Sequence, residues 1–218
     1  MKNLLITQRE ETSIYGGKID SLEAEYVKFF SNLGFNVIPV SNFNEKPRNY
    51  FDVLECDCLV LSGGGMLFPE AYVEKIECPR QLHREFVERE LIEEAIKRNI
   101  SIIGICHGMQ VLNSFFGGKM ISIKNLESHK VGKEHHIYSL KTRDKFVVNS
   151  YHDYAVYRNT LGRELLPLFV SSEGFIVEMF QHERKNIIGI QWHPERMSTN
   201  TAEKNSPMKI VKEFLGKC

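Results

Sequence analysis

An isoleucine-rich run over residues 100–105 is the feature that most constrains how this chain can fold. Runs of this kind, without regular polar alternation, are typical of strands that are buried on both faces of a parallel sheet. Parallel neighbours require crossover connections, which are usually helices. The run therefore predicts an α/β architecture with this strand near the middle of the sheet.

The segments around this run alternate between strand and helix patterns. Hydrophobic periodicity predicts strands at 4–7, 36–40 and 58–61, and helices at 20–33, 80–98 and 111–116. The long helix 80–98 is expected to bury Phe86, Leu91, Ala95 and Ile96. The second half is richer in strands, which are predicted at 136–141, 146–148, 168–171, 174–180 and 187–191, before a last helix at 207–215. These patterns predict a single domain over residues 1–218, an open and mostly parallel sheet with helices on both faces and extra strands in its second half.

Composition excludes several function classes. The 28 Lys and Arg residues balance 28 Asp and Glu residues, which argues against a general nucleic-acid binder. Apolar runs are far shorter than the ~20 residues that span a bilayer, and the N-terminus resembles a first strand more than a signal peptide. The 5 cysteines are odd in number and irregularly spaced, so we expect reduced thiols in the cytoplasm.

The sharpest local motif is Gly-Ile-Cys-His-Gly at residues 104–108, between the buried strand and a helix. A side chain on such a strand-to-helix turn points outward, and the glycines allow the backbone to pack closely around it. The helix dipole would favour a thiolate at Cys106. A buried structural cysteine is the alternative interpretation of this residue taken alone.

Two further motifs supply what a thiol nucleophile needs. Trp-His-Pro-Glu at residues 192–195 offers His193 as a base and Glu195 to orient it, although a surface histidine beside a proline turn is the simpler alternative. The Ser-Gly-Gly-Gly loop at residues 62–65 can turn backbone N–H groups toward a developing oxyanion. It could also be a plain turn, but its spacing does not fit a nucleotide-binding loop.

Together, these motifs resemble those of the class I glutamine amidotransferases, which have a flavodoxin-like α/β fold, and the resemblance runs from about residue 4 to residue 196. Arg-Glu-Phe-Val-Glu at residues 84–88, Asn113, Gly-Gly at 117–118 and Val-Asn-Ser-Tyr-His at 148–152 are similar to the free-standing γ-glutamyl hydrolase branch. That branch often has arginine directly after the cysteine, where this chain has His107. The difference leaves the nature of the leaving group open.

The resemblance implies a cysteine-dependent hydrolysis of a γ-glutamyl amide, with glutamate and an amine or phosphoramidate as products. It implies a catalytic triad of Cys106, His193 and Glu195, and an oxyanion hole formed by the backbone N–H groups of Gly64 and His107. It also implies that no organic cofactor or metal is needed.

Four residues are expected to contact the substrate: Gln110, Ser150, Tyr151 and Arg9. By the resemblance, Gln110 and the backbone at 150–151 would hold the amino acid end of the glutamyl group. Arg9 follows the first strand, where open α/β sheets place ligands, so it could bind a carboxylate or phosphate. A surface arginine is an equally good interpretation.

The segment 124–136 is rich in lysine and histidine and would suit a phosphorylated leaving group, although a solvated loop is the simpler interpretation. No Cys pair or i,i+4 His pair accompanies these histidines, which argues against a zinc site.

Two functional alternatives remain beside a free-standing hydrolase. A glutaminase subunit would deliver ammonia to a synthase partner, and a non-catalytic relative would be expected to have lost the cysteine or the histidine. Both residues are present, and the branch features favour a hydrolase that acts alone on a small γ-glutamyl substrate, without nucleic acid or membrane.

Overall fold

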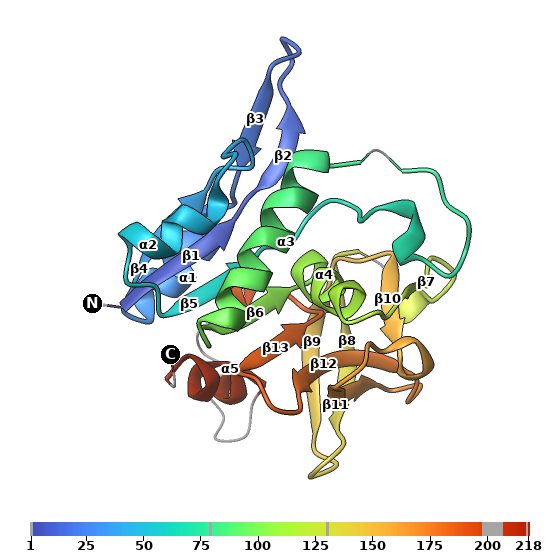
Figure 1. Cartoon of the computed structure of the whole chain (residues 1–218). Helices are drawn as coiled ribbons and strands as arrows, with labels where there is room; N and C mark the ends of the chain where they lie inside the picture. The colour runs from blue at the N-terminus through green and yellow to red at the C-terminus, as the bar shows by residue number, and fades with distance from the viewer. Residues whose placement is uncertain (1, 79, 130, 198–206, 217) are drawn as a thin grey trace.

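A mixed sheet forms the centre of the computed structural model, which describes residues 2–78, 80–129, 131–197, 207–216 and 218. Within these residues the main sheet has 11 strands, and nine of them follow the order β4-β1-β5-β6-β13-β12-β11-β8-β9 (Figure 1). The first five strands of this order are parallel: β4 (Phe35–Val40), β1 (Lys2–Thr7), β5 (Cys58–Leu61), β6 (Ser101–Ile105) and β13 (Ile187–Ile190).

The second half of the sheet is antiparallel. It continues through β12 (Ile176–His182), β11 (Leu165–Ser171), β8 (Lys133–Ser139) and β9 (Lys145–Ser150). Two strands lie off this path: β10 (Tyr154–Tyr157) pairs with β12 and with β7 (Met120–Ser122). The predicted mostly parallel sheet with extra strands in its second half is confirmed, although β7 and β10 are too short to leave a clear sequence pattern.

Helices cover both faces of the parallel half because successive side chains of its strands point to opposite faces. On one face Leu5 and its neighbours pack against α3 (Leu82–Lys97) and α4 (His107–Phe115). On the other face Leu4 and Ile6 pack in a second core with α1 (Ala24–Asn32) and α5 (Pro207–Leu215). The central strands are therefore apolar at consecutive positions, as the run at residues 100–105 predicted.

The predicted helix at residues 20–33 was wrong at its start. Residues Lys18–Ser21 form strand β3, which pairs with β2 (Arg9–Thr12) in a separate hairpin, and α1 begins at Ala24. The Asp20 carboxylate accepts hydrogen bonds from Ser41 Oγ at 2.6 Å and Asn42 Nδ2 at 2.7 Å, which tie it to the loop after β4. These long-range contacts have no local sequence signal. Figure 1 shows the hairpin projecting from the body of the sheet.

The inner face of α3 also differs from the prediction. Phe86 is 48% exposed, whereas Val87, Leu91 and Ala95 are buried. The buried face includes Arg84 and Glu88, whose charges made that face look like a solvent-facing one in the sequence. Among the helices described, none has the length and apolar character that a membrane span requires.

Candidate active site

Cys106 stands on a strained turn between β6 and α4. Its φ of 51° is unusual for a residue with a side chain, and strain of this kind is often found at functional sites. Two glycines are required here, since a Cβ on Gly108 would lie 2.1 Å from the Leu61 carbonyl oxygen, and one on Gly104 would lie 2.4 Å from the Gly108 oxygen. The close packing that these glycines permit fixes the turn that presents the thiol.

His193 follows β13, the strand beside β6, and forms a short polar contact with a carboxylate. Its Nδ1 lies 2.6 Å from Glu195 Oε1, and both side chains are buried. Asn149 fixes the His193 backbone by accepting from its N–H at 2.8 Å and donating to its carbonyl at 2.9 Å. The imidazole faces the same pocket as Cys106, so the structure brings the three side chains together across 87 residues of sequence from 106 to 193.

The environment of His193 favours its protonated form. Burial lowers the pKa of the imidazole, but hydrogen bonding and charge from Cys106 and Glu195 outweigh burial and raise that pKa to about 9. An unfolded histidine titrates near ~6.5. The folded state therefore binds this proton more tightly, and the resulting stabilisation is complete below pH ~6.5 and lost as the pH rises through about 9.

We expect the protonation of His193 to make the free energy of unfolding depend on pH. The free energy of unfolding of the wild type, relative to a His193→Gln variant, should fall as the pH is raised from about 6 to about 10. Urea titrations of both proteins at several pH values measure it. A difference that stays constant across this range would contradict an imidazolium at His193.

The glycine loop after β5 lies against the same pocket. Gly64 and Gly65 have φ of 88° and 85°, which side chains rarely adopt, and Gly63 N–H donates to the Tyr26 hydroxyl at 2.9 Å. Within the described part of the chain, the backbone N–H groups of Gly64 and His107 donate no hydrogen bond. Both are free to stabilise negative charge in the pocket.

A buried ion pair holds this loop in place. Arg84, fully buried on α3, donates to the carbonyl oxygens of Ser62 at 2.8 Å and Gly64 at 2.6 Å, and to Glu88 Oε1 at 2.8 Å. Glu88 also lies 3.4 Å from the ring of His107. Burial alone would raise the pKa of Glu88, but the charges of Arg84 and His107 lower it to about 2.

Neither Arg84 nor Glu88 has a role predicted from the sequence, although the segment 84–88 contributes to the resemblance. The available signal was an i,i+4 pair of opposite charges in phase with Leu91 and Ala95 on the helix. His107 occupies the position where the similar branch often has arginine, and its ring packs toward Glu88. The carboxylate of Glu88 thus links α3 to His107, the residue after Cys106.

The pocket has a volume of about 360 Å³, within the range of small-molecule sites. Gln110 lines it and donates to the Tyr154 carbonyl at 3.0 Å. Tyr151 also lines it, and its ring packs edge-on against His193 at 5.4 Å. The buried hydroxyl of Ser150 donates to the His129 carbonyl at 2.7 Å and Ser150 is not among the residues that line the pocket, so the expected contact through the backbone at 150–151 stays a prediction.

Cations surround the mouth of the pocket. Arg9 lines it, but its guanidinium is paired with Glu11 at 3.3 Å and Glu23 at 3.5 Å. Lys124 also lines it and lies 5.4 Å from the Tyr154 ring, with no carboxylate of the described residues paired to it. Among the described cations of the basic segment 124–136, Lys124 is the one that lines the pocket, whereas His129 and His135 are buried elsewhere.

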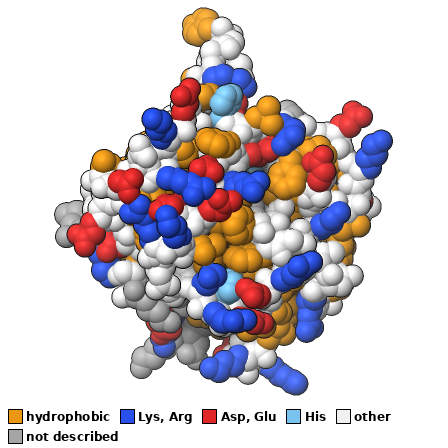
Figure 2. Space-filling view, viewed as in Figure 1, with side chains coloured by type: hydrophobic (Ala, Val, Ile, Leu, Met, Phe, Trp, Pro, Cys, Tyr) orange, Lys and Arg blue, Asp and Glu red, His pale blue; other side chains and the backbone are white. Residues whose placement is uncertain are grey.

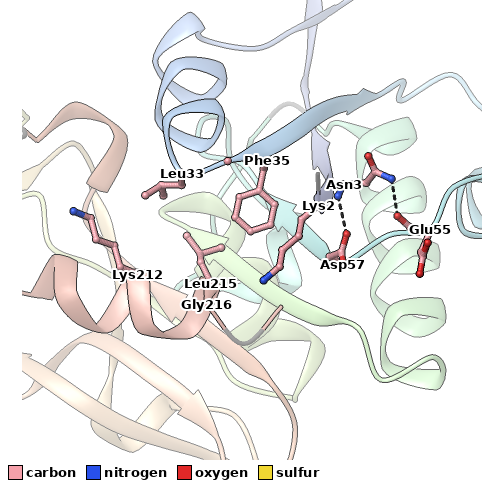
Figure 3. Close-up of a pocket in the computed structure, with 10 residues that line it drawn as sticks. Lys2, Asn3, Leu33, Phe35, Glu55, Asp57, Lys212, Leu215 and Gly216 are labelled. Atoms are coloured by element: carbon pink, nitrogen blue, oxygen red, sulfur yellow. Dashed lines mark hydrogen bonds between the residues drawn. The ribbon is translucent and has the colours of Figure 1, made fainter.

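Of two further hollows, one lies away from this site and the other shares His107 with it. One lies where β1 and β5 begin, beside the Asn3–Asp57 hydrogen bond of Figure 3, at the opposite strand ends from Cys106. The other is an apolar groove between α3 and α4, with Leu82, Phe86 and Phe115 exposed by 57%, 48% and 38%. Figure 2 shows apolar side chains gathered in the middle of this face.

Comparisons with known proteins show which family the chain resembles. The Peptidase C26 family profile matches residues 5–195. The chain is 31% identical over 183 residues to the γ-glutamyl-CDP-amidate hydrolase of Campylobacter jejuni, covering 84% of each chain. It is 28% identical over 208 residues to a glutamine amidotransferase-like protein of Lactococcus lactis, covering 85% of each.

Solved structures show the same fold. A glutamine amidotransferase of Thermotoga maritima superimposes with a TM-score of 0.62 at 20% identity, over 89% of this chain and 76% of that one. A GMP synthase component from Thermoplasma acidophilum gives 0.63 at 16% identity, over 100% and 94% of the two chains. At such identities the likeness concerns the fold alone.

Proposed function

The chain belongs to the Peptidase C26 family of class I glutamine amidotransferase-like proteins, and on this basis we propose that it hydrolyses γ-glutamyl amides through Cys106. The observation that carries the proposal is the joint placement of a strained Cys106, a buried His193–Glu195 contact of 2.6 Å and unbonded N–H groups in one pocket. These are the parts that acyl transfer to a thiol requires.

In the proposed reaction, His193 already holds the proton of the Cys106 thiol, as its raised pKa favours, and Cys106 Sγ attacks the γ-carbonyl carbon. The N–H groups of Gly64 and His107 stabilise the oxyanion. His193 then donates the proton to the leaving nitrogen, the C–N bond breaks, and a γ-glutamyl thioester remains on the sulfur. Water, deprotonated by His193, attacks the thioester carbon. The C–S bond breaks, glutamate is released, and Cys106 and protonated His193 are regenerated. Glu195 holds the imidazole in position throughout.

Gln110 and Tyr151 are proposed to contact the glutamyl group, since both line the pocket near the sulfur. Arg9, whose side chain packs beside Gly64, is proposed to bind a carboxylate or phosphate of the substrate. Ser150 is proposed to contribute through its backbone, next to Tyr151, since its hydroxyl is bonded to the His129 carbonyl. We further propose that the chain works in the cytoplasm, where its five free cysteines would stay reduced.

For the substrate we propose γ-glutamyl-CDP-amidate, hydrolysed to glutamate and cytidine diphosphoramidate in the assembly of a capsular phosphoramidate. Support comes from the similarity to the Campylobacter jejuni hydrolase and from Lys124, a cation without a carboxylate partner among the described residues at the pocket. A diphosphate would give this ammonium a partner. γ-Glutamyl-γ-aminobutyrate, which lacks phosphate, is the alternative hydrolase substrate.

The test is glutamate release by the purified protein, compared as kcat/KM for glutamine, γ-glutamyl-γ-aminobutyrate and γ-glutamyl-CDP-amidate. We expect the nucleotide conjugate to be preferred, and Lys124→Ala to lower its kcat/KM about tenfold while leaving the other two unchanged. Lys133→Ala is the matched control, because Lys133 is an exposed lysine of the same segment that does not line the pocket. Equal losses for all three substrates would contradict a phosphate contact at Lys124.

A glutaminase that serves a synthase is the second candidate, and the exposed apolar groove between α3 and α4 is the observation that favours it. Such a patch is common at protein–protein contacts. A glutaminase of this kind would prefer plain glutamine in the same assay and would need a synthase for full turnover. Efficient hydrolysis of a substituted amide by the isolated chain would contradict it.

A further inference from the structure

A second group of chemically active side chains lies outside the proposed reaction. His129 ends the short helix η3 (Glu127–His129), His135 lies on β8, Glu178 lies on β12, and His152 follows β9. Their exposed fractions are 2%, 5%, 0% and 5%. Four separate segments therefore bring three imidazoles and one carboxylate together in the interior. Buried polar groups of this kind need partners.

Three of these side chains converge on one point. His135 Nε2 lies 3.1 Å from Glu178 Oε1, and His129 Nδ1 lies 3.7 Å from the same oxygen. Each residue of this trio offers one atom to a set in which all atoms lie within 4.8 Å of one another. Ligand atoms around a tetrahedral zinc ion are separated by roughly 3.3 Å, as follows from metal–ligand bonds of ~2.0–2.1 Å. Small side-chain rotations would bring the three atoms to that spacing.

The hydrogen bonds within the cluster do not account for its burial. Both ring nitrogens of His129 and of His135, and both oxygens of Glu178, lack a hydrogen bond, although His129 Nε2 lies 3.6 Å from Glu173 Oε2. One proton shared between His135 and Glu178 would satisfy a single pair of atoms and leave the other inward-facing lone pairs without partners. Leaving such groups unpaired costs roughly 1–3 kcal/mol each. A cation at the centre would satisfy several at once.

His152 is oriented as a fourth participant. Its Nδ1 lies 3.1 Å from the Tyr154 carbonyl, which can accept a hydrogen bond but cannot donate one. Nδ1 must then carry the hydrogen, and Nε2 keeps its lone pair. Nε2 is buried without a hydrogen bond, and the ring centre lies 5.7 Å from that of His129. A carbonyl that fixes the tautomer in this way is the usual companion of a metal-bound histidine.

We propose that His129, His135 and Glu178 bind one zinc ion, with His152 or a water molecule completing the coordination. Two imidazoles and a carboxylate suit zinc better than magnesium or calcium, which prefer all-oxygen sites. The sequence argued against such a site because the ligands lie on separate segments without a zinc-binding spacing. The fold supplies the proximity that the spacing lacks.

The ion would stabilise one wall of the active-site pocket. It would tie β8 and β12 to the segment that carries Tyr151 and His152, and both of these residues line the pocket. Tyr151 in turn packs against His193. The zinc would act on the position of this wall and would take no part in bond breaking. The proposal does not depend on which γ-glutamyl compound is the substrate.

The first test is metal content and cobalt spectroscopy. Purified protein should hold about one zinc per chain, and protein stripped with chelator and given Co²⁺ should show the visible absorption of tetrahedral cobalt. His135→Ala and Glu178→Gln should lose at least nine-tenths of the metal. His136→Ala is the matched control, since His136 is the next residue of β8 but is exposed, and it should bind metal as the wild type does.

Stability gives a second readout that does not require the variants to fold. Zinc added to the stripped wild-type protein should raise Tm by at least about 5 °C, because a ligand that binds only the folded state stabilises it. A stripped wild-type protein that folds normally, takes up neither zinc nor cobalt, and keeps its Tm when zinc is added would overturn the proposal. Equal metal loss in His136→Ala would overturn the assignment of the ligands.

Discussion

Replacing Cys106 with alanine is expected to lower γ-glutamyl hydrolysis by at least about 10³-fold and to leave the fold intact. The sulfur forms the bond to the acyl carbon in the proposed reaction, and no other described thiol lines the pocket. Glutamate release with the preferred substrate measures the loss, and circular dichroism verifies the fold. Wild-type turnover in this variant would exclude the thioester pathway.

The Cys106→Gly variant distinguishes the effect of the thiol on activity from the effect of backbone strain on stability. Cys106→Gly should be as inactive as Cys106→Ala, but it should be more stable than alanine by about 1 kcal/mol, because glycine adopts a φ of 51° without a Cβ clash. Urea unfolding of the two variants measures this difference. Equal stabilities would show that the turn carries no strain at Cys106.

Replacing Arg84 with alanine is expected to have the largest effect on stability. Arg84 and Glu88 are both buried and paired at 2.8 Å, and truncation of the arginine leaves the carboxylate without its main partner. Removing one partner of a buried ion pair costs about 3–5 kcal/mol. The carbonyl oxygens of Ser62 and Gly64 also lose their donor, so kcat should fall in whatever fraction of the variant remains folded.

Two further variants test whether the buried Arg84–Glu88 pair and the contacts of Arg84 with the loop carbonyls cause these losses. Arg89→Ala removes an exposed arginine that pairs with Glu93 on the same helix, and it should change stability by less than about 1 kcal/mol. Arg84→Lys keeps the charge but loses the planar group that reaches both carbonyls. Its loss of kcat, expressed as a free energy, should therefore exceed its loss in free energy of unfolding. A kcat near the wild-type value in Arg84→Lys would show that the loop does not depend on the arginine fork.

The parallel half of the fold was predictable because its strands are buried on both faces and leave long apolar runs. The run at residues 100–105 and the strand at 58–61 each appear in the structure within one or two residues of the prediction. The β2–β3 hairpin was missed since its residues are polar and Asp20 is held by contacts with Ser41 and Asn42. Tertiary contacts of this kind outweigh local pattern.

The candidate site divides in the same way. Cys106, His193 and Glu195 occur in short motifs whose residue types suggest their chemistry, so they could be chosen from the sequence. Arg84 could not, because a charged helix residue is normally exposed and only the fold shows the loop carbonyls that it binds. The His129–His135–Glu178 cluster could not either, because nothing in the sequence indicates that these segments meet.

The sheet changes from parallel to antiparallel pairing, and the pocket is lined by residues from both halves. The sulfur, its imidazole and the free N–H groups come from β5, β6 and β13 or the turns after them, all in the parallel half. Lys124, Tyr151 and His152 come from segments next to β7, β9 and β10, in the other half. Selection can therefore alter one wall while the other stays constant. Such a division makes the scaffold modular: the antiparallel half can change in sequence without altering the strands and turns that carry Cys106 and His193.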